Sequence, residues 1–289
     1  MAPSGPIQVR GEVLSVRRVG AYFHVTLLAQ GVAERVRPGH FVALAVGGES
    51  SSMLLRRSFS IYRAQERGVY GGTVEIVLAA HGPGTSWLAG CRPHDPVDVV
   101  GPLGTPFALP KDPASCTLVG GGYGSAPLFS LADALRARGC RVDVVLGAGS
   151  EDRLFGVLDA KRISQSVTVT TDDGSLGHRG RVTDVLPAVF ARADTDVVYA
   201  CGPMAMLRAL SEVAAAHGVA AQVAVEEAMA CGIGVCMTCV LPVVGDDGVT
   251  RMVRSCTEGP VFRGESVRWA DVGTVPPDCL GAPLPAGGH

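Results

Sequence analysis

The first third of the chain alternates apolar and polar residues over short, valine-rich stretches separated by glycine or proline. A period of two is typical of half-buried antiparallel strands. Residues 85–89 follow a glycine turn and predict a single short helix. The expected strands cover residues 11–16, 22–28, 41–46, 74–78 and 96–99. This pattern predicts an antiparallel β-barrel domain over residues 1–109.

From residue 110 the pattern changes to strand, glycine turn and helix. The predicted strands cover residues 116–119, 141–146, 166–171 and 196–200, and the predicted helices cover 126–138, 182–192 and 203–217, after which an apolar stretch covers 221–225. Such alternation is typical of a parallel sheet covered by helices. We therefore predict an α/β nucleotide-binding domain over residues 110–222.

The rest of the chain predicts a small third domain and a tail. Residues 240–244 and 249–253 flank Gly245-Asp-Asp-Gly248 and predict a hairpin inside a cysteine-rich segment, residues 223–268. The end of the chain, residues 269–289, is rich in proline and glycine and is expected to be disordered. The fold class is thus multi-domain: barrel, α/β domain and small cysteine-rich domain.

Composition narrows the classes of function. With 289 residues, 47% hydrophobic and 18% charged, the chain suits a globular protein of two domains and a small appendage. The net charge is −2 and no run of lysine or arginine occurs, which argues against a nucleic-acid or membrane-surface partner. No signal-peptide pattern or membrane-spanning stretch is found, so we expect a cytoplasmic protein.

Four of the nine cysteines form the strongest chemical motif of the chain. Cys231, Cys236 and Cys239, followed by Cys256, have the C-x4-C-x2-C…C spacing of plant-type [2Fe–2S] centres. Gly232 and Gly234 permit turns that aim backbone N–H groups at the cluster sulfurs. A zinc site is the alternative, although such sites favour paired C-x2-C turns, and unliganded thiols are a third interpretation. For Cys91, Cys116, Cys140 and Cys279 we expect small apolar side chains or free thiols.

Two motifs of the predicted barrel suit a flavin nucleotide. Arg57 and Phe59 share one face of a strand-like stretch, and Ser58 and Ser60 share the other, so an edge position presents a guanidinium to phosphate. The turn from His81 to Thr85 opens the short helix and is typical of a pyrophosphate site. A surface basic pair beside a core phenylalanine is the structural alternative for the first motif.

Glycine-rich turns of the α/β domain suit a dinucleotide. Gly120, Gly121, Gly122 and Gly124 lie between a strand and a helix, as a dinucleotide-binding turn requires, although the spacing is not a strict G-x-G-x-x-G. Glu151 and Asp152 follow the second strand, where acidic groups bind ribose hydroxyls and disfavour NADP. Cys201, Gly202 and Pro203 end a later strand at the ligand-binding edge; a buried thiol is the alternative for Cys201.

Taken in order, these motifs resemble the ferredoxin-NADP-reductase-like superfamily. Within it, Thr171-Asp-Asp-Gly-Ser175 and the segment Cys256-Thr-Glu-Gly-Pro-Val-Phe262 are most similar to electron-transfer subunits of NAD-dependent dihydroorotate dehydrogenase. The resemblance covers residues 7–268. It implies an FAD, a [2Fe–2S] cluster and NAD as cofactors. It also implies a separate FMN-containing catalytic subunit that oxidises dihydroorotate in pyrimidine (UMP) biosynthesis, within a heterotetramer of two plus two subunits.

The resemblance also assigns residues to the cofactors. Iron would be held by Cys231, Cys236, Cys239 and Cys256. The ribityl and phosphate part of the flavin would lie on Arg57, Ser58, Phe59 and Ser60, its ring on Val77, Leu78 and Ala79, and its pyrophosphate on Gly84 and Thr85. The chain departs from the family at Ser58, Phe59 and Pro83, where proline, an aliphatic residue and a basic residue are common.

The resulting hypothesis is a redox relay in which the flavin joins one-electron to two-electron transfer. No carboxylate pair or Ser/His/Asp arrangement stands out, so we expect no catalytic side-chain acid or base. The alternative within the superfamily is a subunit that exchanges NAD(P)H electrons with ferredoxin, a hydrogenase or a sulfur reductase. A zinc-bound scaffold is the alternative from another class.

Overall fold

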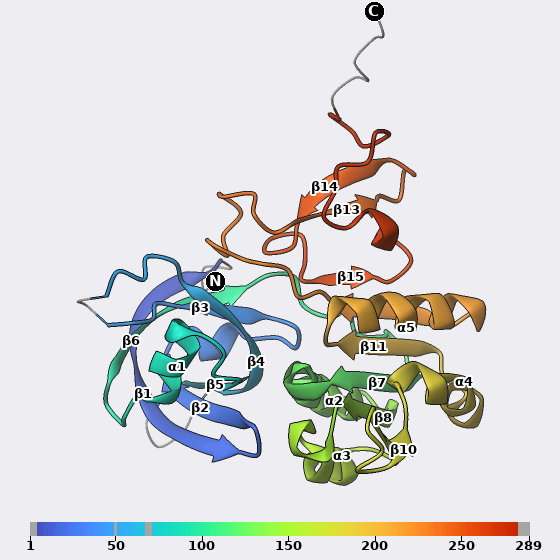
Figure 1. Ribbon diagram of the computed structural model, residues 1–289, viewed down its shortest axis with the longest axis horizontal. Coiled ribbons are helices and arrows are strands. Elements are labelled where there is room, and N and C mark those ends of the chain that lie inside the picture. Colours follow the sequence, from blue (N-terminus) through green and yellow to red (C-terminus); the bar gives the residue numbers. More distant parts are fainter. Residues whose placement is uncertain (1–4, 49–50, 67–70, 283–289) are drawn as a thin grey trace, which may run out of the picture.

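The chain folds into a barrel, a nucleotide-binding α/β domain and a smaller part that lies above them in Figure 1. The computed structural model describes residues 5–48, 51–66 and 71–282. Among the described residues no helix is long and apolar enough to cross a lipid bilayer.

Six antiparallel strands close the barrel in the order β1-β2-β5-β4-β3-β6. Valine, leucine and isoleucine from alternate strand positions fill its interior, among them Val25, Leu27, Val42 and Ile76. The predicted antiparallel barrel is thus confirmed. Its elements are β1 (Ile7–Val19), β2 (Tyr22–Leu28), β3 (Phe41–Leu44), β4 (Arg57–Gln65), β5 (Thr73–Leu78), the helix α1 (Pro83–Ala89) and β6 (Pro96–Leu103).

The second domain has a mainly parallel sheet in the order β10-β9-β8-β7-β11-β12-β15, which confirms the predicted α/β fold. Its strands are β7 (Ser115–Gly121), β8 (Arg141–Ala148), β9 (Ser166–Thr171), β10 (His178–Arg179), β11 (Val197–Cys201) and β12 (Ala220–Ala224). Its helices are α2 (Ala126–Ala137), α3 (Val157–Ile163), α4 (Val182–Ala193) and α5 (Met204–Ala216). The first two helices pack in one hydrophobic cluster and the last two in another, so both faces of the sheet are covered.

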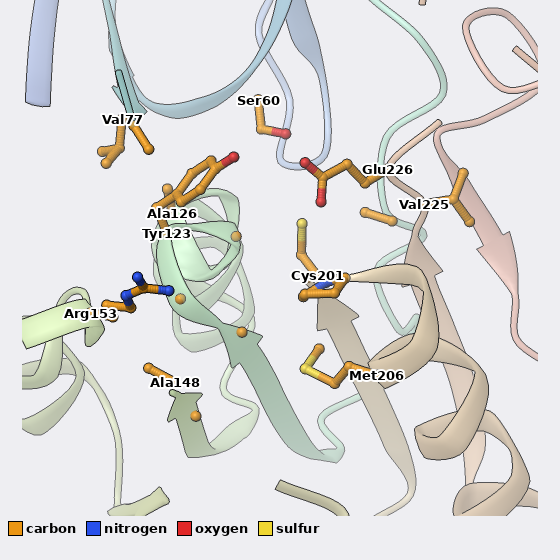
Figure 2. A pocket seen from close by; sticks show the side chains of 18 of the residues that line it. Ser60, Val77, Tyr123, Ala126, Ala148, Arg153, Cys201, Met206, Val225 and Glu226 are labelled. Atoms are coloured by element: carbon orange, nitrogen blue, oxygen red, sulfur yellow. The ribbon is translucent and has the colours of Figure 1, made fainter. Parts of the chain in front are cut away.

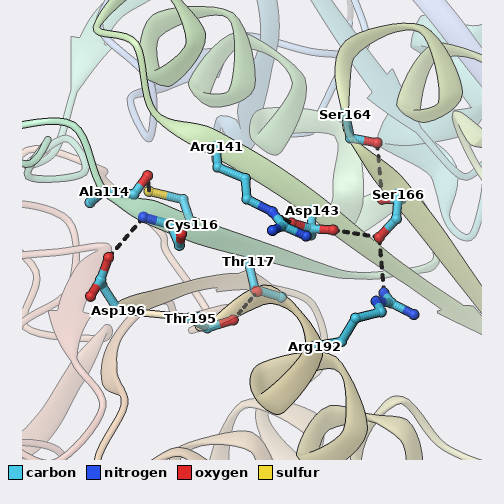
Figure 3. A network of polar contacts seen from close by, with 11 residues as sticks. Ala114, Cys116, Thr117, Arg141, Asp143, Ser164, Ser166, Arg192, Thr195 and Asp196 are labelled. Carbon is cyan, nitrogen blue, oxygen red and sulfur yellow. Dashed lines mark hydrogen bonds and ion pairs between the residues drawn. The ribbon is translucent and has the colours of Figure 1, made fainter.

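Polar side chains stabilise the amino-terminal edge of this sheet (Figure 3). The buried Asp143 carboxylate accepts hydrogen bonds from Arg141 Nε, at 2.8 Å, and from Ser166 Oγ. Arg192 donates to the same serine oxygen at 2.9 Å, and Asp196 accepts from the backbone N–H of Ser115 at 2.8 Å. These groups satisfy one another, which leaves the carboxyl ends of the strands as the edge available to ligands.

The third part is attached to the α/β sheet by a strand. Its hairpin consists of β13 (Val240–Val244) and β14 (Thr250–Arg254), and β15 (Val261–Arg263) then pairs antiparallel with β12. The boundary predicted near residue 222 therefore falls inside β12. The sequence pattern does not reveal this, because a three-residue edge strand has no periodicity of its own and its partner lies elsewhere in the chain.

The end of the chain differs from the disordered tail that we predicted from residue 269. A 3-10 turn at Trp269–Asp271 follows the hairpin, and Arg268 forms ion pairs of 2.8 and 2.7 Å with Asp271 and Asp278. Cys279 is buried, and the N–H of Leu280 donates to the carbonyl of Thr250 at 2.8 Å. These contacts tie residues 269–282 to the hairpin. Residues 283–289 lie outside the described part.

Aromatic side chains join the barrel to the α/β domain. Tyr62 of β4 lies edge-on to Phe129 of α2 and to Phe155, with ring centroids 5.6 Å apart in both pairs. Tyr22 of β2 lies 5.2 Å from Tyr123. All five rings belong to or pack against one hydrophobic cluster that crosses the domain boundary, so the two domains present fixed walls to the space between them.

Candidate functional site

A cavity of about 770 Å³ lies between the barrel and the carboxyl ends of the parallel strands (Figure 2). Residues of β4 and β5 form its barrel wall, and the ends of β7, β8, β9, β11 and β12 form the opposite wall. Ligands of open α/β folds bind at this edge. The volume suits extended nucleotide ligands, since ligand pockets commonly measure roughly 300–1,000 Å³.

Most of the residues proposed from the sequence to bind FAD or NAD line this one cavity. They are Arg57, Ser58, Phe59, Ser60, Val77, Leu78, Ala79, Thr85, Gly121, Gly122, Gly124, Cys201, Gly202 and Pro203. Gly84 and Gly120 lie behind the wall. A Cβ at Gly84 would stand 2.9 Å from Val46 Cγ2, and one at Gly120 would stand 2.4 Å from Ser125 Cβ. These two glycines therefore permit close packing behind the cavity surface.

The two arginines at the start of β4 have different environments. Arg56 forms a 2.8 Å ion pair with Asp98 and donates to its carbonyl, which uses its charge within the barrel. Arg57 donates to the carbonyl oxygens of Leu55 and Arg56, at 2.8 and 3.3 Å, and has no carboxylate partner among the described residues. Its uncompensated charge in the cavity suits a phosphate group.

The turn before α1 is fixed by one threonine. Thr85 Oγ1 accepts from the N–H groups of His81 and Gly82, both at 3.1 Å, and donates to the carbonyl of Gly82. Pro83 has no N–H, so Gly84 and Thr85 hold the first N–H groups of the helix, which have no carbonyl partner within it. Thr85 lines the cavity, so its predicted pyrophosphate role is consistent with this arrangement, whereas Gly84 lies behind the wall.

The glycine turn after β7 brings two backbones into close approach. A Cβ at Gly124 would stand 2.9 Å from Gly202 Cα, and one at Gly121 would stand 2.9 Å from both Pro203 Cδ and Met206 Sδ. Side chains at these positions would fill the cleft where the ends of β7 and β11 meet. The glycines thus permit the ends of β7 and β11 to lie close together beneath the cavity, as the glycines of a dinucleotide-binding turn do.

Polar side chains from three elements converge at the barrel end of the cavity. Figure 2 shows Ser60 of β4, Cys201 of β11 and Glu226, which follows β12, directed toward a common space. Burial, and secondarily the Glu226 carboxylate, raise the pKa of the Cys201 thiol to about 12, so it stays protonated. Sequence reasoning missed Glu226 and Glu227. Their position directly after a buried strand at the ligand edge is the signal that marks them.

The two acidic residues expected to contact a ribose lie away from the cavity. Glu151 and Asp152 form a 3-10 turn with Arg153 and do not line the cavity, whereas Arg153 and Asp172 do. The N–H of Glu151 donates to Ser175 Oγ at 2.8 Å, and Asp152 accepts from Ser150. The turn directs the Arg153 side chain into the cavity (Figure 2), and neither carboxylate is among the residues that line it.

The loop that carries Cys231, Cys236 and Cys239 directs backbone N–H groups toward sulfur. The N–H groups of Ile233, Val235 and Cys236 point at Cys231 Sγ from 3.4–3.5 Å, and Gly232 and Gly234 have positive φ of 72° and 82°. Glycine adopts such angles at no steric cost because it has no Cβ. The predicted role of these glycines is consistent with this geometry.

The four thiols form two pairs. The N–H of Cys236 donates to Cys231 Sγ at 3.5 Å, and Cys239 and Cys256 pack together in one hydrophobic cluster. A two-iron cluster takes two thiolates on each iron, so two pairs suit it better than one compact set. Within the described residues, no group of three or more His, Cys, Asp or Glu side chains is arranged as ligands of a single metal ion.

The two pairs have different environments. A hydrogen bond from the Thr238 hydroxyl lowers the pKa of the exposed Cys236 to about 6, whereas burial raises the pKa of Cys256 to about 12. Cys239 and Cys256 pack in one cluster with Phe41, Ala43 and Leu103 of the barrel. Met229 packs against the same cluster, and both Met229 and Phe41 also line the cavity. The buried pair of thiols thus shares a wall with the cavity.

Comparison with known families agrees with this division of the chain. Residues 226–268 match the iron–sulfur cluster binding domain of dihydroorotate dehydrogenase B. Residues 118–212 match an oxidoreductase NAD-binding domain. The first match contains all four paired cysteines, and the second contains the glycine turn and Cys201.

Individual relatives extend the similarity over nearly the whole chain. The solved structure of an NADH-dependent reduced ferredoxin-NADP oxidoreductase is 30% identical, with a TM-score of 0.79 over 91% of both chains. A ferredoxin NADP+ reductase from Neisseria gonorrhoeae with bound FAD and NADP shares the fold, with 16% identity and a TM-score of 0.59 over 73% of this chain and 92% of its own. The dihydroorotate dehydrogenase B (NAD(+)) electron transfer subunit of Bacillus caldolyticus is 40% identical over 85% of this chain and 92% of its own length. This chain therefore belongs to the family of dihydroorotate dehydrogenase B electron transfer subunits.

Proposed function

We propose that this chain relays electrons from a separate dihydroorotate-oxidising subunit to NAD+, through a [2Fe–2S] cluster and an FAD, in pyrimidine biosynthesis. The observation that carries the proposal is the wall shared by the thiols and the cavity. Phe41 belongs to the same hydrophobic cluster of side chains as Cys239 and Cys256, and Met229 packs against it. Both Phe41 and Met229 also line the cavity. A flavin on the barrel wall would therefore lie one layer of side chains from the iron.

The two walls of the cavity would bind different cofactors. Arg57 and the first N–H groups of α1 would hold the phosphates of FAD on the barrel wall. Gly121, Gly124 and Gly202 would admit the dinucleotide NAD at the ends of β7 and β11. When bound, the flavin and the cluster supply the exchange between one-electron and two-electron transfer. The protein contributes position, exclusion of water and local charge.

The partner is proposed to be an FMN-containing catalytic subunit in a complex of two plus two chains. Cys236 is exposed on the cluster loop, so one pair of thiols lies at the surface while the other pair is buried toward the cavity. Electrons from the partner would enter at the exposed pair of thiols and leave toward the flavin at the buried pair. We also propose that the assembly works in the cytoplasm, because NAD+, its proposed electron acceptor, is available there.

The test combines this chain with such a catalytic subunit. The chain is loaded anaerobically with FAD, iron and sulfide, mixed with an FMN-containing dihydroorotate dehydrogenase subunit, and supplied with dihydroorotate and NAD+. We expect NADH to form only when both subunits are present, and native mass spectrometry to find two copies of each. Failure of fully loaded proteins to form NADH would reject the proposal.

A second candidate partner is ferredoxin. The observation that favours it is the 91% coverage and 30% identity with the NADH-dependent reduced ferredoxin-NADP oxidoreductase, together with Ser58 and Phe59, where the proposed family commonly has other residues. Reduction of ferredoxin by NADH and the loaded chain alone would support this candidate. Formation of NADH only with dihydroorotate and the catalytic subunit would support the first.

A further inference from the structure

A carboxylate from the end of β9 lies over the end of β8. The N–H of Asp172 donates to the carbonyl of Ala148 at 3.1 Å, and the N–H of Asp173 donates to that of Gly149 at 3.2 Å. A Cβ built on Gly149 would stand 3.9 Å from Asp172 Oδ2. These two backbone hydrogen bonds fix the Asp172 side chain above the carboxyl end of the neighbouring strand.

Asp172 is the acidic residue of this loop that is available to a ligand. The neighbouring Asp173 carboxylate accepts from the N–H and the hydroxyl of Ser175, at 2.9 and 2.6 Å. Asp172 lines the cavity and has no side-chain hydrogen bond or ion pair to any described residue. Glu151 and Asp152, which the sequence motif favours for this role, do not line the cavity.

The fold determines which end of a dinucleotide reaches Asp172. Its nicotinamide must meet a flavin at the barrel wall, beside Ser60 and Cys201 (Figure 2). In the sheet, β7 lies between β11 and β8, so a dinucleotide that starts at Cys201 crosses the glycine turn and ends at β8. Its adenosine ribose then lies at Gly149, beneath the Asp172 carboxylate.

A positively charged side chain, that of Arg181, lies near the same end of the cavity. A Cβ at Gly147 would stand 2.3 Å from Val182 Cγ1, so the start of α4 packs against the end of β8. Arg181, the residue before α4, lines the cavity, and its guanidinium has no ion pair within the described part of the chain. If the Asp172 carboxylate were removed, the Arg181 guanidinium would suit a phosphate on the ribose.

We propose that Asp172 selects NAD over NADP. Its carboxylate accepts a hydrogen bond from the 2′-hydroxyl of the adenosine ribose and repels a 2′-phosphate, as an acidic residue beside the ribose does in other dinucleotide-binding sheets. Here the residue comes from β9 and reaches across to β8. The inference rests on the proposed function in one respect: a nicotinamide dinucleotide occupies the cavity.

The test measures binding without any catalytic partner. Isothermal titration of the FAD-loaded chain gives dissociation constants for NAD+ and NADP+, and for ADP and adenosine 2′,5′-bisphosphate, which report on the adenosine end alone. We expect Asp172→Asn to lower the preference for the ligands without a 2′-phosphate by roughly tenfold or more. The double variant with Arg181→Gln should lose the gained affinity for the 2′-phosphate.

Two control variants and a folding check keep the result clear. Glu151→Gln tests the acid favoured by the motif, and Asp133→Asn, exposed on α2, matches the change in net charge; both should keep the wild-type preference. Asp172 is exposed, so its variant should keep its FAD content and melting temperature. A preference unchanged in Asp172→Asn, or lowered equally in Glu151→Gln, would overturn the inference. Because no dihydroorotate is involved, this failure is distinct from failure of the proposed electron relay.

Discussion

Tyr22 of the barrel donates its phenolic hydroxyl to the backbone carbonyl oxygen of Arg153 in the α/β domain, at 2.7 Å. The same turn directs the Arg153 side chain into the cavity (Figure 2). This hydrogen bond therefore couples the relative position of the two domains to the position of a cationic group in the candidate site.

Replacement of Tyr22 by phenylalanine should weaken this coupling and keep the aromatic packing. We expect a loss of about 1 kcal/mol in the free energy of unfolding by urea, together with weaker NADH binding, because the hydroxyl is removed and a carbonyl loses its donor. Tyr62→Phe is the matched control, since its hydroxyl lies at a long 3.5 Å from Asp159 Oδ2. An equal effect of both variants would argue against a specific role of Tyr22.

Replacement of Cys256 by alanine should remove the iron and leave the flavin. The thiol belongs to the buried pair, whereas the residues proposed for FAD lie on β4, β5 and α1. We expect the iron content to fall to near zero, with FAD content and NADH-dependent ferricyanide reduction retained. Cys91→Ala, outside the four-cysteine motif, should retain its iron. Loss of flavin together with iron in Cys256→Ala would contradict separate sites.

Local sequence patterns predicted the two large domains because each has a regular period. Period-two alternation marks β2 and β5, and the strand-turn-helix order marks β7 and α2. The cysteine spacing likewise identified a loop whose backbone N–H groups point at Cys231. These features depend on residues that are close together in the sequence.

Features that depend on distant segments were missed. Phe41 of β3 packs in one hydrophobic cluster with Cys239 of the iron-binding loop, and Asp172 lies over the end of β8 although it follows β9. The tail from residue 269 is rich in proline and glycine, yet Arg268 pairs with Asp271 and Asp278 and also donates to Thr250 of the hairpin. No local period encodes which segments meet in space, so the shared wall and the proposed ribose contact could be inferred only from the structure.

Replacement of Glu226 by glutamine should slow hydride transfer from NADH. The carboxylate faces the space shared with Ser60 and Cys201, where the nicotinamide ring is proposed to lie (Figure 2). The ring becomes positive as it loses hydride, and a nearby negative charge stabilises that change. We expect kcat for NADH-dependent ferricyanide reduction to fall by roughly tenfold, with a smaller change in KM. Glu212→Gln, on the exposed face of α5, is the control. A change in KM alone would indicate a role in binding only.

His40 should make the protein less stable as the pH falls from about 6.5 to about 4. Burial, and secondarily the charge of Arg37, lower the pKa of His40 from 6.5 to about 4. Its Nδ1 accepts from the N–H of Arg37 at 3.0 Å, and protonation would abolish this acceptor. Between these pH values His40 binds a proton in the unfolded chain but not in the folded chain. The free energy of unfolding is therefore highest above pH 6.5, the pKa of His40 in the unfolded chain, and falls as the pH decreases below it.

The predicted loss in the free energy of unfolding reaches up to about 3 kcal/mol near pH 4. The variant His40→Gln should not show this part of the pH dependence. Urea unfolding at several pH values measures both quantities. His94→Asn is the control, because the His94 side chain is 80% exposed and asparagine tolerates its positive φ of 74°. If the free energy of unfolding of His40→Gln falls between pH 6.5 and 4 as steeply as that of the wild type, another group causes the acid sensitivity.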